Sequence, residues 1–185
     1  MATDTRDRIL AALRMLLAGG GTDAATLENV AAEAGVSKGG LLYHFPSKQD
    51  LFRGLLTQTR DAVTAELGAL DTADDVVRAF LDYSAPRDEQ ERGFIMALIT
   101  AIRSDQPGAG TPADSDEYQV AALFADIFAA WEAPIRAAVD DQVTAEIILQ
   151  VGNGMYLAAV CGLPAPDPTL LQQVIERLLA SAHRE

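Results

Sequence analysis

Apolar residues recur along the chain at the three- and four-residue spacing of an amphipathic helix, and no segment alternates long enough to predict a strand. The first apolar stripe runs from Ile9 to Leu17, and the three glycines at 19–21 are expected to end that helix. Stripes of the same spacing continue to the C-terminus. The pattern therefore predicts an all-α protein of about nine helices.

Two short helices are expected after the first one. Thr26 stands at the N-cap position of the second helix, and Gly35 suits the left-handed backbone that stops it. Ser37 is the next N-cap, and the third helix should run to about His44, because Pro46 blocks its continuation. Three short helices before residue 47 are therefore expected.

A longer fourth helix should begin at Ser47, whose spacing from Asp50 resembles a capping box. A loop is expected at 105–116, where Gly, Pro, Ser and Asp gather, and a turn at 163–168. Five more apolar stripes predict helices around residues 76–83, 94–102, 123–135, 147–161 and 170–179.

The segment Ala34-Gly35-Val36-Ser37 has the features of a helix-turn-helix turn: a glycine that bends, a small apolar plug and a serine cap. In such a motif the third helix packs one face and presents a small or polar N-terminal face to the DNA major groove. The run Lys38-Gly39-Gly40 meets this requirement. The two glycines cost about 1 kcal/mol each against alanine, which makes sense if DNA bases come close there. Leu41 and Phe45 are expected in the core.

Charge is distributed unevenly along the chain. The net charge is -13, yet residues 1–53 contain six basic and six acidic side chains, so all the excess acid lies in residues 54–185. The two lysines of the chain, Lys38 and Lys48, both lie in the neutral N-terminal part. Two interpretations of the positions of these lysines are open: chance in a lysine-poor protein, or a requirement for lysine only where the protein binds phosphates.

Residues 35–51, G-V-S-K-G-G-L-L-Y-H-F-P-S-K-Q-D-L, resemble the signature of the tetracycline-repressor (TetR) family, and residues 26–34 are similar as well. The resemblance covers about residues 5–55 without gaps. It implies a helix-turn-helix DNA-binding domain at 1–50 and a helical domain for effector binding and dimerisation at 51–185. The expected function is a transcriptional regulator, a repressor that binds a palindromic operator in double-stranded DNA as a homodimer.

The resemblance also implies roles for single residues. In this family the third helix reads the groove and its flanks hold phosphates. The sequence departs from the family at Leu42, where a tyrosine hydroxyl often meets a phosphate; Tyr43 could take over that contact. A half-packed position of Tyr43 against the first helix is the alternative. The expected DNA-binding residues are Thr26, Ser37, Lys38, Gly39, Gly40, Tyr43, His44 and Lys48.

The family uses its C-terminal helices for dimerisation and for a small-molecule effector, which here is expected to be hydrophobic. Small residues in the eighth helix allow close helix approach, although packing inside one subunit is the alternative. The expected dimer residues are Gly152, Gly154, Ala158, Leu171, Val174, Ile175 and Leu178. The effector candidates, which plain core packing also explains, are Phe94, Met96, Ile99, Phe124, Phe128, Trp131, Met155 and Tyr156.

Other functional classes find little support in the sequence. The chain has two histidines, no metal-ligand spacing and no glycine-rich loop after a strand, so we expect no enzyme, metal or cofactor. Cys161 lies in an apolar helix and is expected to be an inert core thiol. A transcriptional activator of the same family, and a helical interaction module without DNA binding, remain alternatives.

The expected location is the cytoplasm, without a membrane partner. The polar N-terminus has no signal-peptide pattern, and a single cysteine cannot form an internal disulfide. The stretch 147–166 carries no charge and is long enough to span a bilayer. It also contains Gln150, Asn153 and three glycines, so a buried or dimer-forming helix is the better interpretation.

Overall fold

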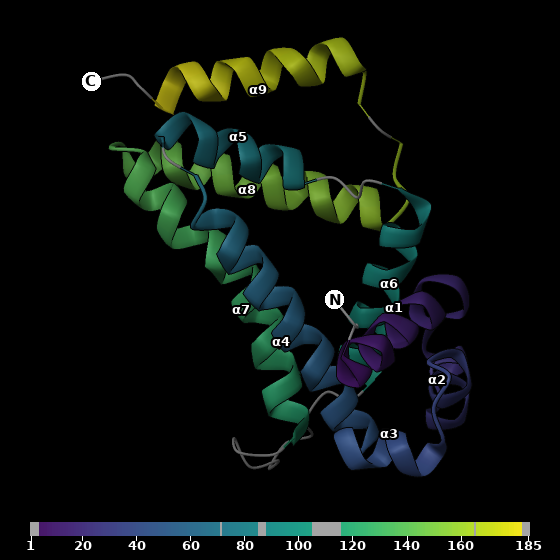
Figure 1. Ribbon diagram of the computed structural model, residues 1–185. Helices are drawn as coiled ribbons and strands as arrows, with labels where there is room; N and C mark the ends of the chain where they lie inside the picture. Colours follow the sequence, from purple (N-terminus) through teal and green to yellow (C-terminus); the bar gives the residue numbers. More distant parts are fainter. Residues whose placement is uncertain (1–3, 71, 85–87, 105–115, 165, 183–185) are drawn as a thin grey trace. The chain divides into compact units, whose positions relative to one another are not determined.

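The computed structural model describes residues 4–70, 72–84, 88–104, 116–164 and 166–182, of which 73–75, 102–104 and 116–121 are described by their backbone alone. Within these ranges the chain is helical and has no strand, which confirms the all-α prediction (Figure 1). The helices are α1 (Thr5–Ala24), α2 (Leu27–Glu33), α3 (Lys38–His44), α4 (Lys48–Leu67), α5 (Ala73–Tyr83), α6 (Glu89–Ser104), α7 (Asp116–Ala138), α8 (Gln142–Val160) and α9 (Pro168–Ala182).

The chain forms two compact units, each of which is described by itself. The first unit comprises Met1–Arg60 and Asp88–Asp126, and the second unit comprises Asp61–Arg87 and Ile127–Glu185. The predicted division at residue 50 concerns function rather than compactness, and it stays a prediction. The loop expected at 105–116 lies outside the described residues except for Asp116, which begins α7.

The glycines expected to end α1 break it rather than stop it. Gly21 has a φ of 66° and non-helical backbone, but a further helical turn continues to Ala24. Glycine tolerates this left-handed conformation without the steric cost that a Cβ brings. The prediction that α1 ends at these glycines is therefore wrong by one turn, because α1 ends at Ala24. The prediction that Thr26 is the N-cap of α2 is confirmed.

In the first unit α1 packs along α2 and α6. The contact with α6 is close at Gly93, where a Cβ would overlap the carbonyl oxygen of Ala18. Nearby, the guanidinium of Arg14 lies 4.3 Å from the ring centroid of Phe94. Backbone approach and a cation–π contact therefore hold α1 and α6 together.

In the second unit α5, α8 and α9 pack pairwise against each other (Figure 1). Helix α8 begins at Gln142, earlier than the stripe from residue 147 predicts, because Asp141 accepts hydrogen bonds from the backbone N–H groups of Val143 and Thr144 as its N-cap. The pKa of Asp141 is lowered, mainly by the hydroxyl of Thr144, which donates to the same carboxylate. Polar capping thus extends the helix beyond its apolar stripe.

Candidate nucleic-acid interface

The turn between α2 and α3 has the predicted geometry. Gly35 has a φ of 66°, and the N–H of Val36 donates to the carbonyl of Ala31 at 2.9 Å. Arg8 of α1 donates through Nη2 to the carbonyl oxygen of Ala34 at 2.8 Å. Because that carbonyl lies at the end of α2, Arg8 ties the turn to α1. Sequence reasoning missed this role, since 26 residues separate the partners.

The inner face of α3 is buried, as predicted. Leu41 and Phe45 are almost completely inaccessible to solvent. A Cβ on Gly54 of α4 would lie 2.6 Å from the ring of Phe45, and the guanidinium of Arg6 lies 5.3 Å from the centroid of that ring. The orientation of α3 is therefore fixed by its packing on α1 and α4.

The opposite face of α3 is exposed at its N-terminus. Ser37 accepts a hydrogen bond from the backbone N–H of Gly40 at 3.0 Å, which confirms it as the N-cap. Lys38 and Gly39 are exposed, and Gly40 is half-buried. A Cβ on Gly39 would meet nothing nearer than the hydroxyl of Ser37 at 4.0 Å. No contact among the described residues therefore requires glycine at position 39.

Tyr43 and His44 lie side by side at the end of α3. The ring of Tyr43 is 85% exposed, so the alternative in which it is half-packed against α1 is wrong. The two rings make an edge-to-face contact with centroids 5.2 Å apart. His44 is half-buried and Leu42 is also half-buried. The phenol of Tyr43 is therefore accessible to a partner outside the chain.

The remaining predicted DNA-binding residues, Thr26 and Lys48, come before and after α3 in the sequence. Thr26 accepts from the backbone N–H of Asn29 at 3.1 Å, which confirms the N-cap of α2. A capping hydroxyl uses a lone pair in this bond and keeps its O–H as a donor. Lys48, the first residue of α4, is exposed, with its Nζ 5.8 Å from the ring centroid of Phe52.

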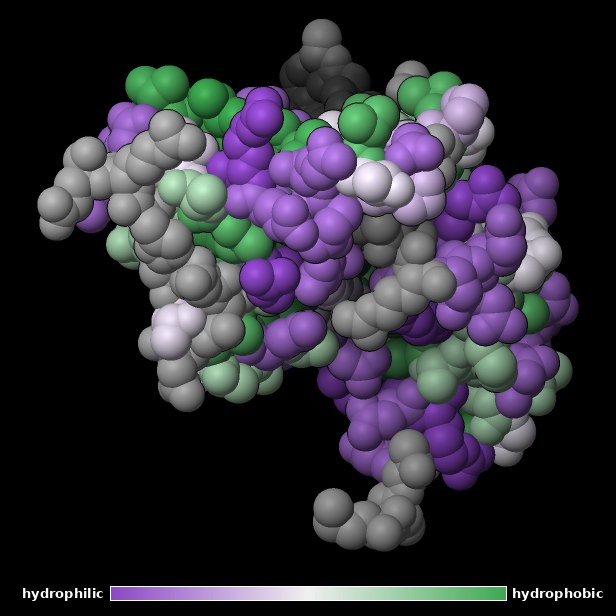
Figure 2. All heavy atoms as spheres, turned by 90° about the horizontal axis from the view of Figure 1, so that it is seen from above, coloured by the Kyte–Doolittle hydropathy of each residue, from purple (hydrophilic) through white to green (hydrophobic). Residues whose placement is uncertain are grey.

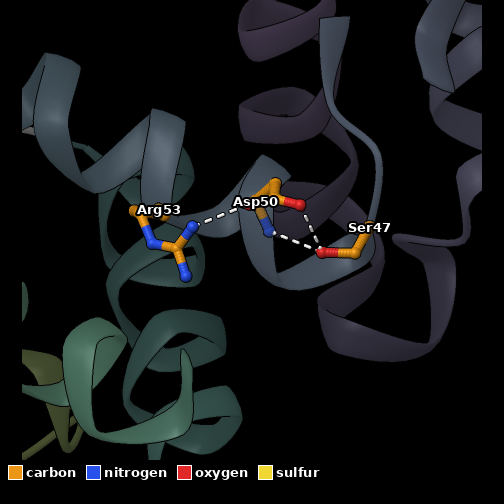
Figure 3. A network of polar contacts seen from close by, with 3 residues as sticks. All are labelled: Ser47, Asp50 and Arg53. Atoms are coloured by element: carbon orange, nitrogen blue, oxygen red, sulfur yellow. Dashed lines mark hydrogen bonds and ion pairs between the residues drawn. The ribbon is translucent and has the colours of Figure 1, made fainter. Parts of the chain in front are cut away.

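The start of α4 differs from the capping box that its sequence suggests. The N–H of Asp50 donates to the hydroxyl of Ser47 at 3.0 Å, and that hydroxyl donates to the carboxylate of Asp50 at 2.7 Å (Figure 3). The carboxylate therefore binds the hydroxyl of Ser47 instead of a backbone N–H. It also accepts from Nη1 of Arg53 at 2.6 Å, so the charge of Asp50 is balanced within α4.

An ion pair that the sequence did not indicate joins α2 and α3. Nζ of Lys38 lies 2.5 Å from Oε1 of Glu28, and both side chains are more than half exposed. The hydrogen bond from Lys38 is the largest cause that lowers the pKa of Glu28, followed by the backbone N–H of Glu28 itself and the charge of Lys38. Lys38, which is predicted to face the groove, is therefore paired with the carboxylate of Glu28.

The effector candidates are divided between the two units. Phe94, Met96, Ile99 and Phe124 belong to the first unit, and Phe128, Trp131, Met155 and Tyr156 to the second. Met96 is exposed and lines a hollow of about 320 Å³ between α6 and the glycine-rich end of α1. Phe94 is buried in the core. Of the effector candidates, Met96 alone belongs to the lining of this hollow.

Aromatic side chains of the second unit make ring contacts with one another. Trp131 is buried, with the rings of Phe80 and Tyr83 at centroid distances of 5.7 and 5.4 Å. The indole Nε1–H of Trp131 donates no hydrogen bond to any residue that the structure describes. Phe128 makes an edge-to-face contact with Tyr156 at 5.5 Å. A buried donor of this kind is usually satisfied, so the indole N–H of Trp131 is available to a further acceptor.

Two residues expected at a dimer interface are buried within the chain. A Cβ on Gly152 would overlap the ring of Phe80, so the close approach that this glycine allows serves α5. Leu178 is buried as well. Gly154 and Val174 are exposed, and Ala158, Leu171 and Ile175 are half-buried.

Large hydrophobic side chains of the second unit are nevertheless exposed, and Figure 2 shows one face on which hydrophobic groups reach the surface beside hydrophilic ones. From Val143 onward the exposed positions of α8 follow a spacing of four, three, four and three residues, which places them on one side of the helix. We call this set the α8 row; it consists of Val143, Ile147, Gln150, Gly154 and Leu157. Leu163, Leu170 and Val174 are exposed in the following segment and in α9.

The C-terminal end of α8 carries the cysteine of the chain, Cys161. Cys161 is exposed at the C-cap of α8, so the prediction of a buried core thiol is wrong. Among the described helices, only α8 is long and apolar enough to span a membrane by length and composition, and core helices of soluble proteins pass the same test. No group of three or more His, Cys, Asp or Glu side chains in the described ranges could hold a metal ion.

The chain was compared with known proteins. Residues 9–55 match the family of bacterial regulatory proteins described as the tetR family, and residues 74–183 match a tetracyclin repressor-like C-terminal domain. Among curated relatives, the HTH-type transcriptional regulator SrpR of Pseudomonas putida is 35% identical over 103 residues. That alignment spans 53% of this chain and 47% of SrpR, about half of each.

Solved structures share the fold over nearly the whole chain. A transcriptional regulator from Rhodococcus sp. Rha1 superposes with a TM-score of 0.70 at 22% identity, covering 96% of this chain and 95% of that one. The multidrug binding protein EbrR in complex with ethidium gives a TM-score of 0.65 at 22% identity, covering 95% of this chain and 98% of EbrR. The solved structures show that the chain has this fold, and the matches of its sequence show the family to which it belongs.

Proposed function

Since this chain belongs to the TetR family, a family of DNA-binding transcriptional regulators and not of enzymes, we propose that it is a repressor that binds a palindromic operator as a homodimer. A small hydrophobic effector releases it. The proposal rests on one observation about α3: its inner face is buried, while its N-terminal outer face has small or polar residues and is exposed. This is the arrangement with which a recognition helix enters the major groove.

The proposed DNA contacts fall into two kinds. Lys38, Gly39 and Gly40, with Ser37 before them, face base edges. Phosphates are met by the hydroxyl of Thr26, by the exposed phenol of Tyr43, by His44 and by Lys48 at the start of α4. Backbone contacts of this kind fix the register of a protein on the duplex, whereas base contacts specify the sequence.

Lys48→Ala is expected to lower the slope of log affinity against log salt by about 0.9, because one phosphate contact is lost. Affinity for every duplex should fall alike, since phosphates carry no sequence information. The measurement is fluorescence anisotropy with a mixed-sequence duplex at several salt concentrations.

The matched control is Arg78→Ala, which removes an exposed cation from α5 in the second unit. Its slope should equal that of the wild type. If Lys48→Ala and Arg78→Ala behave alike, Lys48 is not part of the DNA site.

The dimer is supported by the exposed α8 row together with Leu171, Val174 and Ile175 of α9. Soluble monomers rarely expose large contiguous apolar surfaces. Two such helices from each of two chains would form a four-helix bundle around a twofold axis. A palindromic operator has the same twofold symmetry, and its half-sites lie about one helical turn apart. Gly152 and Leu178 are not part of the proposal.

The effector site is proposed around the aromatic residues of the second unit, with Trp131 as its polar anchor. Buried indole N–H groups usually find an acceptor, and that of Trp131 has none among the described residues. EbrR, which has the same fold, is named as a multidrug binding protein and was solved with ethidium. The proposed ligand is therefore an apolar molecule that carries a hydrogen-bond acceptor.

Trp131→Phe is expected to weaken ligands that carry an acceptor by about 2- to 13-fold, the value of one net hydrogen bond. Ligands would be found by screening hydrophobic compounds for a thermal shift, and their affinities measured by calorimetry. Matched ligands without the acceptor should bind both proteins alike, which separates the hydrogen bond from packing against Phe80 and Tyr83. Equal losses for both ligand classes would remove the indole N–H from the site.

Repression is proposed over activation because an operator-bound dimer can block a promoter without further contacts. A reporter gene behind an operator-containing promoter separates the two: expression should fall when the protein is present and recover with effector. A rise in expression would favour the activator. Since operators lie on chromosomal DNA, the proposed location is the cytoplasm.

A further inference from the structure

We propose that Glu28 and Lys38 act as one unit that reads a single base pair, with cytosine facing Glu28 and guanine facing Lys38. The proposal rests on the proposed function, in which α3 enters the major groove, and it assigns the sequence preference of that groove contact. Glu28 is then a specificity-determining residue on α2, outside the recognition helix.

The ion pair places a carboxylate at the groove-facing tip of α3. Nζ of Lys38 lies 2.5 Å from Oε1 of Glu28, and the side chains are 54% and 63% exposed. Exposed ion pairs contribute little to folding stability. A carboxylate beside the DNA surface also opposes phosphate binding. The carboxylate lies in the first turn of α2, where it accepts from its own backbone N–H and favours the helix N-terminus. General attraction to DNA does not explain its ion pair with Lys38, and base reading does.

Both partners keep hydrogen-bonding capacity for a third group. An ammonium has three donors, and a carboxylate has two oxygens with about four acceptor sites. The ion pair uses one N–H of Lys38, and Glu28 accepts from Lys38 and from its own backbone N–H. Two donors and further acceptor sites remain, side by side on an exposed surface.

The spacing of this donor and acceptor matches the edge of a base pair. In the major groove cytosine presents the N4 amino donor, and guanine presents the O6 and N7 acceptors. N4 and O6 are hydrogen-bonded to each other, so they lie about 2.9 Å apart. The carboxylate of Glu28 can accept from N4 while the ammonium of Lys38 donates to O6 and N7.

The other three pairs fit less well. Adenine facing Glu28 still offers its N6 amino group, but its N7 lone pair then lies near the carboxylate and the thymine methyl near Lys38. Guanine or thymine facing Glu28 presents a carbonyl oxygen to the carboxylate, and two acceptors at this distance repel each other. The expected ranking at this position is C·G first, A·T second, and G·C and T·A last.

The reading face of α3 offers few competing contacts. Gly39 and Gly40 have no side-chain donor or acceptor, and Ser37 has only its O–H left for a base because its oxygen caps α3. A single strongly read base pair within each half-site, surrounded by weaker preferences, is therefore expected.

The test compares wild type with Glu28→Ala, Lys38→Ala and the double variant. The probes are duplexes carrying the sequence that wild type enriches from a random pool, with each half-site position changed in turn to the other three pairs. The wild type should prefer C·G over G·C at one position by about 5- to 150-fold. Each single variant should lose that preference and keep the others, and the double variant should lose no more than either single variant.

The matched control is Glu33→Ala, which removes an exposed carboxylate from the same helix α2. Its base preferences should equal those of the wild type. If Glu28→Ala instead raises affinity for all duplexes alike, as a mere removal of charge does, or changes no position, the base-pair assignment is overturned while DNA binding stands. If wild type enriches no sequence, the proposed function and this proposal both fail.

Discussion

Replacing Ile147 by glutamate is expected to convert the protein to a monomer and to weaken operator binding by about 10²- to 10⁴-fold. Ile147 is 49% exposed in the middle of the α8 row, between Val143 and Leu157. A carboxylate there would have to be desolvated at the proposed twofold interface without a partner. In the dimer, binding of one helix-turn-helix holds the second at a high local concentration near its half-site. Once the dimer separates, this avidity of about 10²- to 10⁴-fold is lost.

Sedimentation velocity at micromolar protein and anisotropy with the selected operator measure both effects. The control is Ala129→Glu, which adds the same charge at an exposed position of α7 in the second unit. It should remain dimeric and bind as tightly as wild type. A dimeric Ile147→Glu protein with unchanged affinity would move the interface away from the α8 row.

Gly39→Ala is expected to raise the free energy of unfolding by up to about 1 kcal/mol and to weaken operator binding by about 5- to 150-fold. Alanine favours a helix over glycine, and the new Cβ meets nothing closer than Ser37 at 4.0 Å. On DNA the same methyl group points at base edges, where overpacking costs about 1–3 kcal/mol. Stability and function should therefore change in opposite directions.

Urea unfolding measures the first effect and anisotropy the second. The control is Gly19→Ala in α1, where an added Cβ finds open space and no DNA contact is proposed. It should stabilise the protein without loss of affinity. Tight operator binding by Gly39→Ala would mean that glycine at 39 does not serve close approach of the bases.

The N-terminal fold is predictable from the sequence because its signals are local. Thr26 and Ser37 cap helices that begin one residue later, and Gly35 adopts the left-handed backbone its position suggests. Caps and positive φ depend on three or four neighbouring residues, so a sequence is enough to find them. The buried positions of Leu41 and Phe45 follow from helical periodicity in the same way.

Contacts between distant segments could not be found by such reasoning. Arg8 reaches Ala34 only because α1 packs on α2. Glu28 reaches Lys38 only because the turn at Gly35 sets the angle between α2 and α3. Small residues in α8 permit close approach on either side of the helix, so their pattern does not tell an internal neighbour from a second subunit. For Gly152 the neighbour is Phe80 of the same chain.

In the proposed function, two copies of this chain present their α3 helices to successive major grooves. The decisive measurement is the selection of bound sequences from a random duplex pool, with purified protein at moderate salt. A palindrome whose half-sites lie about one helical turn apart, each with a C·G pair at a fixed position, is expected to be enriched. Enrichment of a single unpaired half-site, or of no sequence at all, would contradict the proposed function.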